Sequence, residues 1–151
     1  MAGFKFSTGL KNGILSADSL EGLLTDGYIK LYGGTVPPTA DSLISAGSSL
    51  LLTYSNAGAL GAGNGLNFGV VTSGTLGKEP TQIWSGVAEA TGVATFFRFV
   101  AQADTGVDST SQIRIQGTVG GAGADMFVQS TAIADTTNYT IDYFTIAIPS
   151  V

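Results

Sequence analysis

The feature that most constrains this chain is a series of short apolar segments, alternating with polar residues, that begins at position 28. A period of two places successive side chains on opposite faces of a β-strand. The turns between the segments are rich in Gly, Ser, Thr, Asn and Asp, the residue types that favour turns. We predict about eight strands, at residues 28–32, 50–54, 66–70, 83–87, 93–101, 113–119, 126–129 and 139–148.

No long helical pattern separates these segments, which argues against alternating strand and helix units. The sequence therefore predicts a mainly β protein, either an antiparallel β-sandwich or a jelly roll, with a short N-terminal helical segment. A length of 151 residues corresponds to a single domain, residues 1–151. We interpret residues 8–27 as the helical segment and residues 28–151 as the sandwich. Residues 1–7 are interpreted as an extended arm, or alternatively as a segment folded back on the sandwich.

The helical segment has two parts. Residues 8–15 and 18–24 both place leucines at helical spacing. We expect Ser16 or Asp18 to cap the second helix, and Glu21 to complete a capping box with Asp18. Several glycines weaken both helices, because each costs about 1 kcal/mol relative to Ala.

The alternation also predicts which side chains share a core. The apolar positions of the strongest strands fall on one face, and we expect them to pack together. The only tryptophan, Trp84, is expected in the same interior rather than at a contact surface. The residues predicted for this core are Phe97, Phe99, Ile113, Ile115, Phe144 and Ile146.

The composition excludes several kinds of chemistry. The chain has no cysteine and no histidine, which removes thiol catalysis, the nucleophile–histidine pairs and the usual zinc sites. Its six basic residues are dispersed and the net charge is −5, whereas nucleic-acid binding needs clustered Lys and Arg. We therefore expect no enzymatic activity, no cofactor, no metal and no nucleic-acid partner.

No segment suggests export or a membrane. The first residues lack the apolar region of a signal peptide, and no stretch approaches the roughly 20 apolar residues of a membrane helix. We expect a soluble protein that is made in the cytoplasm and has no membrane partner.

Two short motifs resemble parts of functional sites. Residues 61–65 read Gly-Ala-Gly-Asn-Gly, like part of a dinucleotide-binding loop, but a strand pattern follows where that loop needs a helix. Asp104, Thr105 and Gly106 match the short signature of aspartic proteases, which need two carboxylates sharing a proton. Asp-Thr-Gly is also ordinary turn chemistry, and we interpret both motifs as loops.

Four side chains are candidate contacts to a partner protein or to another subunit. Phe4 and Phe6 lie in the first seven residues and have no evident partner within the chain. Arg98 and Arg114 lie on two strands that, if neighbours, bring both to the outer face. Arginine and aromatic residues are enriched at interfaces. The alternative is that both arginines extend over apolar surface of their own chain.

Several stretches of the chain together carry a resemblance. They are STGLK (7–11), GYIKLYGG (27–34), PPTAD (37–41), ATFFRF (94–99), RIQGTVG (114–120), GADM (123–126) and IDYF (141–144). Over nearly the whole chain this resembles a family of small tailed-phage virion structural proteins of the capsid decoration, or cement, type. The resemblance implies a viral structural protein that binds the major capsid protein lattice on the capsid exterior and stabilises the bacteriophage head, after synthesis in the host cytoplasm.

A protein that binds a symmetric shell matches it best as a cyclic oligomer, and we expect a homotrimer. Two alternatives stay open. The chain could be another virion component, such as a connector, tail or baseplate protein. It could also be a receptor- or glycan-binding β-sandwich, which would need aromatic side chains such as Tyr32, Tyr54 and Trp84 on one exposed face.

Overall fold

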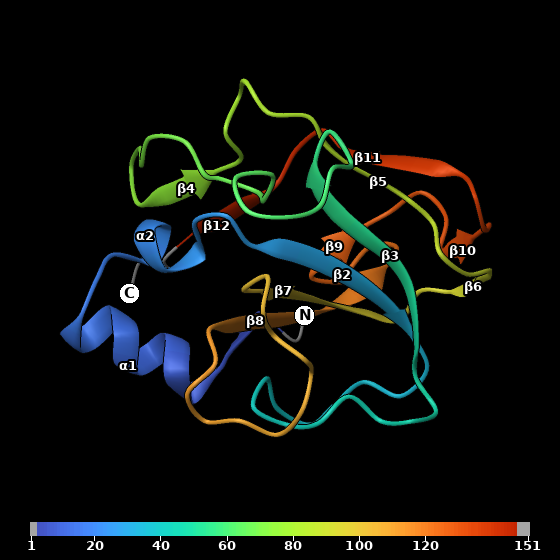
Figure 1. Ribbon diagram of the computed structural model, residues 1–151, viewed down its shortest axis with the longest axis horizontal. Coiled ribbons are helices and arrows are strands. Elements are labelled where there is room, and N and C mark those ends of the chain that lie inside the picture. The colour runs from blue at the N-terminus through green and yellow to red at the C-terminus, as the bar shows by residue number, and fades with distance from the viewer. Residues whose placement is uncertain (1–2, 148–151) are drawn as a thin grey trace.

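The computed structural model describes residues 3–147 of the chain. It confirms the predicted fold class, because 37% of the structure is strand and 10% is helix. The strands form antiparallel sheets in a sandwich-like arrangement, and the two short helices lie at the N-terminal end (Figure 1).

One large sheet dominates the molecule. Its neighbouring strands run in the order β1-β8-β7-β2-β3-β5-β11, and β9 pairs with β8 beside this path. All of these pairs are antiparallel except β8–β9, which is parallel. The strands are β1 (Lys5–Phe6), β2 (Tyr28–Gly33), β3 (Ser49–Asn56), β5 (Trp84–Val87), β7 (Phe96–Val100), β8 (Arg114–Gly120), β9 (Met126–Phe127) and β11 (Asn138–Ile141).

Two smaller antiparallel pairs accompany the large sheet. The first joins β4 (Thr75–Gly77) to β12 (Thr145–Ala147). The second joins β6 (Gly92–Val93) to β10 (Ala132–Ile133).

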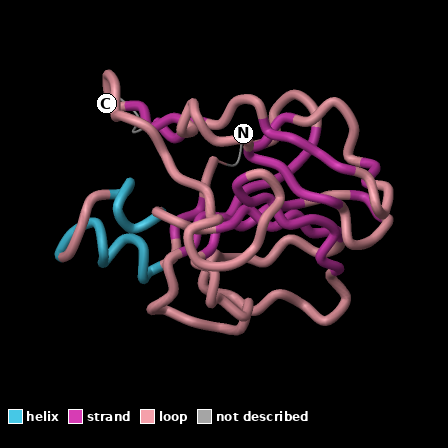
Figure 2. The backbone as a smooth tube through the Cα atoms, turned by 45° about the horizontal axis from the view of Figure 1, so that its top comes forward, coloured by secondary structure: helices cyan, strands magenta, loops and turns pink. Residues whose placement is uncertain are grey.

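The helices are α1 (Thr8–Ser16) and α2 (Leu20–Leu24), which lie together at one end of the molecule (Figure 2). The caps differ from those predicted. Ser19 caps α2, because its hydroxyl accepts a hydrogen bond from the Gly22 amide at 3.1 Å. The predicted cap Ser16 is instead the last residue of α1, and the Asp18 carboxylate accepts from the Ser19 amide.

Three of the predicted strands were wrong in extent. Residues 93–101 divide into β6 and β7, which belong to different sheets. Residues 66–70 form no strand, because their backbone makes only isolated bridges, Leu66 to Gly27 and Phe68 to Lys78, while both side chains are buried. Residues 139–148 divide into β11 and β12, which pair with different strands. The alternation of apolar residues shifts by one position between Tyr143 and Phe144, and the prediction of one continuous strand overlooked this shift; Ile148 lies outside the described residues.

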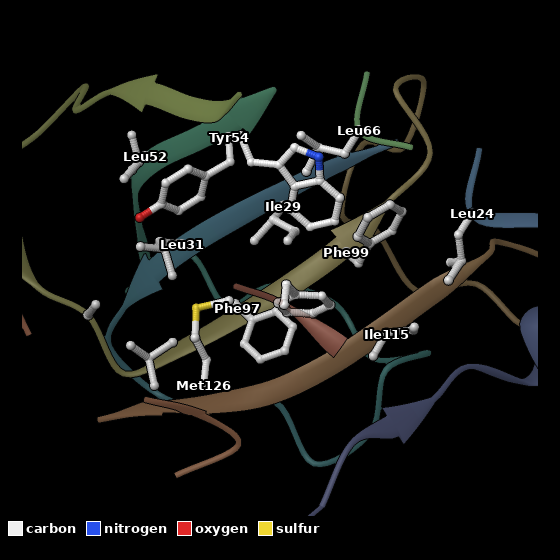
Figure 3. Close-up of a cluster of buried hydrophobic side chains, with 14 of the residues drawn as sticks. Leu24, Ile29, Leu31, Leu52, Tyr54, Leu66, Phe97, Phe99, Ile115 and Met126 are labelled. Atoms are coloured by element: carbon white, nitrogen blue, oxygen red, sulfur yellow. The ribbon is translucent and has the colours of Figure 1, made fainter. Parts of the chain in front are cut away.

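The core lies against one face of the large sheet, where Leu31, Phe97 and Phe99 point into a single buried cluster (Figure 3). The predicted core set is confirmed: five of its members belong to this cluster, and Ile113 packs against it half-buried. Gly117 allows the close fit, because a Cβ atom there would lie 2.6 Å from Cε1 of Phe97.

The described part of the predicted arm is folded onto its own chain. Lys5 and Phe6 pair with Gln116 and Ile115 on β8. The ring of Phe4 lies 5.8 Å from that of Phe97, measured between centroids. The alternative that the segment covers its own sheet therefore holds for residues 3–7, while residues 1 and 2 lie outside the described residues.

Candidate functional site

The two arginines predicted as contacts do lie near one another. In the antiparallel pair of β7 and β8, Arg98 is opposite Gln116, and Val100 is opposite Arg114. Alternation along both strands directs these arginines to the face opposite the core. They are nevertheless buried, with 1% and 0% of their surface exposed. The prediction that Arg98 and Arg114 contact a partner is therefore corrected: in this structure both side chains bind within their own chain.

The cover over this face is the segment between β2 and β3, residues 34–48, which we call the strap. In Figure 1 it is the teal loop below the sheet. Side chains of the sheet donate hydrogen bonds to its backbone carbonyls. Gln116 donates to Pro37, Arg98 to Thr39 and Ser42, and Arg114 to Ala40 and Asp41, over distances of 2.6–3.3 Å.

Arg114 also forms the ion pair of this face. Its Nε and Nη2 atoms donate to the two carboxylate oxygens of Asp104, the second at 2.8 Å, and the side chains of both residues are buried. Nη2 donates further to the carbonyl of Val107 at 2.8 Å. Every N–H-bearing atom of this guanidinium thus has a partner, as a buried charge requires.

The ion pair of Arg114 with Asp104 also bears on whether Asp-Thr-Gly at residues 104–106 is a protease signature or a turn. One carboxylate oxygen of Asp104 accepts from the Gly106 amide at 2.7 Å, which is turn chemistry. Burial raises the pKa of Asp104, but the hydrogen bonds from Arg114 and Gly106 and the charges of both arginines outweigh burial and hold that pKa below its usual value. A low pKa and saturated oxygens are the opposite of a proton-sharing carboxylate pair.

The guanidinium of Arg98 has a less complete set of hydrogen-bond partners than that of Arg114. Its Nε donates to Oε1 of Gln116 at 2.8 Å, but its Nη1 has no hydrogen-bond partner among the described residues. Burial, together with the charge of Arg114, lowers the pKa of Arg98 to about 10. The face thus holds two guanidinium charges against the single buried carboxylate of Asp104.

The glycine-rich loop is held by its own chain. The carboxylate of Asp26 accepts hydrogen bonds from the amides of Gly63 and Gly65, and the hydroxyl of Tyr28 accepts from the amide of Gly61. These are the groups that a phosphate-binding loop would offer to its ligand. The Asp26 carboxylate therefore occupies the position in which a phosphate-binding loop would hold its ligand.

An open groove of about 620 Å³ lies on the side of β9, β10 and β11. Two stretches of chain form its walls, residues 126–130 on one side and residues 138–143 on the other. Its floor consists of core residues, among them Leu31, Tyr54 and Phe144. Burial, reinforced by Tyr139, raises the pKa of Tyr54 to about 12, so this hydroxyl stays protonated.

Two aromatic side chains in the groove wall are open to solvent. Phe127 is 67% exposed and Tyr143 is 80% exposed. Asp142 is the one charged residue that lines the groove. Sequence reasoning missed all three as site residues, because their place on the groove depends on how residues 126–130 and 138–143 lie in the fold.

The aromatic residues that a receptor- or glycan-binding face would have needed are not on the surface. Tyr32, Tyr54 and Trp84 are all buried, so these three residues do not form the exposed platform that this alternative requires. Trp84 lies in the core, as predicted. Its indole N–H donates to Oε1 of Gln82 at 3.0 Å.

Within residues 3–147, no cluster of three side chains suited to holding a metal ion is found. No helix in that part of the chain is long and apolar enough to cross a membrane. Comparisons with protein-family models, curated proteins and solved structures find no match for the chain. What the protein does must therefore be inferred from its own residues.

Proposed function

We propose that this chain is a non-enzymatic structural protein of a tailed-phage virion, which binds the major capsid protein lattice from outside and stabilises the head. The observation that carries this proposal is the open groove, whose apolar floor and exposed Phe127 and Tyr143 offer surface for protein contact. The resemblance of residues 27–41 and 94–99 to decoration proteins supports the same function.

The mechanism is adhesion. Burying apolar surface removes it from water and stabilises the complex. A ligand that binds the assembled shell but not its dissociated subunits stabilises the shell by mass action. Only 11% of the residues are charged, and charged residues are depleted at the centres of interfaces. A homotrimer, which we also propose, would match the symmetric positions of the shell.

The test uses undecorated capsids and purified protein. We expect saturable binding at a fixed number of copies per capsid and a higher temperature of capsid disruption. The double variant Phe127→Ser and Tyr143→Ser removes the exposed aromatic rings and should weaken binding at least about tenfold. The matched control is Leu15→Ser on α1, because Leu15 is apolar and 85% exposed but does not line the groove.

Absence of binding to capsids would contradict the proposal, as would equal weakening by the control. Imaging of the intact virion separates the capsid exterior from a connector, tail or baseplate position. The oligomeric state in solution is measured by light scattering, and a monomer both in solution and on the particle would exclude the trimer.

One observation favours a second candidate, glycan binding. Tyr143, Asn138 and Asp142 line the same groove and combine an exposed ring with hydrogen-bonding groups. Binding to a glycan array that is lost in Tyr143→Ser, without binding to capsids, would establish this candidate instead.

A further inference from the structure

We propose that the groove receives an extended polypeptide segment of a partner subunit, which adds as a further strand to the open edge of β11. The inference deepens the proposed function, on which it rests for the identity of the partner, the major capsid protein. It concerns the backbone of β11 rather than the aromatic rings of the groove.

The hydrogen-bonding direction of β11 follows from its ladder with β5. The Ala88 amide donates to the Thr137 carbonyl at 2.9 Å. Antiparallel pairs alternate between hydrogen-bonded and non-hydrogen-bonded. Tyr139 opposite Gly86 and Ile141 opposite Trp84 are therefore hydrogen-bonded pairs. The amides and carbonyls of these two residues point toward β5.

The backbone groups of Asn138 and Thr140 consequently point away from β5. Among residues 3–147, β11 has no strand partner other than β5. The described residues also supply no other hydrogen bond to the amide or carbonyl of either residue. Both residues line the groove. The groove wall thus presents unpaired donors and acceptors at the spacing of a β-strand, and the complement of such an edge is another extended backbone.

The two edges of the large sheet differ in a way that supports this assignment. The opposite edge is β1, which has only two residues and carries the exposed Lys5. A short strand and a lysine are features that protect an edge from further pairing. Residues 138–142 read Asn-Tyr-Thr-Ile-Asp and contain neither Lys nor Pro. β11 is therefore the edge left open to pairing.

The groove also defines the side chains of its occupant. Its floor is apolar, through Leu31, Val119 and Phe144, so alternate side chains of the added strand are expected to be apolar. Asp142 is its one charged lining residue, which favours Lys or Arg at one position of the occupant. The occupant is therefore an extended segment with apolar residues at every second position and a basic residue near one end.

The experiment first selects short random peptides that bind the intact protein. It then tests overlapping peptides of the major capsid protein for binding. In the free protein, the Asn138 and Thr140 amides should exchange rapidly with solvent by NMR, and those of Tyr139 and Ile141 slowly. We expect a bound peptide to slow exchange at Asn138 and Thr140, and the selected peptides to share the pattern described above.

The variant Thr140→Pro removes one outward amide without touching the ladder to β5 and should weaken peptide binding about tenfold. Thr140→Val, which keeps the amide, is the matched control and should bind normally. If Thr140→Pro does not fold, the exchange measurement on the unaltered protein and the charge reversal Asp142→Lys decide the question.

Failure to select any peptide overturns the inference, as does a peptide that leaves exchange at Asn138 and Thr140 unchanged. Slowed exchange caused by self-association, or by a glycan alone, also overturns it, because the occupant would then be different. Capsid binding that survives Thr140→Pro rejects strand addition but leaves the proposed function intact. Peptide binding at β11 without capsid binding rejects the proposed function and leaves strand addition standing.

Discussion

The two faces of the large sheet are stabilised in different ways, although the same strands build both. On the core face, Phe97 and Phe99 pack among apolar side chains. On the opposite face, Arg98 and Arg114 are as deeply buried but are held by hydrogen bonds to the strap, to Gln116 and to Asp104. Because side chains alternate along the strands, one face of the sheet carries a core held by non-directional apolar packing. The other face carries a polar layer held by directional hydrogen bonds.

The difference matters because the two kinds of contact respond differently to change. Apolar packing is roughly proportional to the area buried and has no required partner atom. A buried charge is stable only while its partner and its hydrogen bonds are all present. A substitution on the core face should therefore lose packing, whereas one on the strap face should leave a charge behind.

The largest effect is expected from Phe97→Ala on the core face. Phe97 is fully buried and contacts the rings of Phe4 and Phe144. Removal of its ring should lower the free energy of unfolding by about 3–5 kcal/mol, measured by denaturant unfolding. A loss under about 1 kcal/mol would show that the ring is not part of the core.

Arg114→Met tests the strap face. The change leaves Asp104 buried without its ion-pair partner and should cost about 3 kcal/mol, measured in the same way. The double variant Arg114→Met with Asp104→Asn removes the remaining charge and keeps an acceptor for the Gly106 amide. It should therefore be more stable than the single variant.

That recovery is the feature that distinguishes the two faces. If the double variant were no more stable than Arg114→Met, the strap face would depend on packing in the same way as the core face. A second substitution near Phe97 offers no comparable control, because a lost ring leaves no charge to neutralise.

The smallest effect is expected from Arg98→Met. The change removes hydrogen bonds to Gln116 and to strap carbonyls, but it also removes a second buried cation whose Nη1 has no partner in the described chain. These effects oppose each other, so stability should change by about 1 kcal/mol or less. A loss as large as that of Arg114→Met would show that Arg98 is the main attachment of the strap.

The alternating strands could be predicted from the sequence because residue period alone determines which side chains share a face. This held for Phe97, Phe99 and Ile115. It failed at residues 66–70, where Leu66 and Phe68 enter the core without a strand. Burial of side chains was visible in the pattern there, but backbone pairing depends on which segment lies alongside.

The two sites could be predicted only in part. That Arg98 and Arg114 are close together follows from neighbouring strands. Their burial does not, because it depends on the strap, a Pro- and Ser-containing segment that looks like an ordinary loop in sequence. The groove joins residues 126–130 to residues 138–143, and no local signal indicates that these stretches face each other.

The way in which the strap is fastened has a consequence for its evolution. The sheet donates to strap carbonyls, at Pro37, Thr39, Ala40, Asp41 and Ser42. Every amino acid carries a carbonyl, so these attachments place no demand on residue type. Within the limits set by Ala40, which is buried, and by the Asp41 carboxylate, which binds Thr8, the strap can diversify its outward side chains while its path over the sheet is retained. In related chains, the outward side chains of the strap should therefore vary most. The two arginines beneath the strap should vary least.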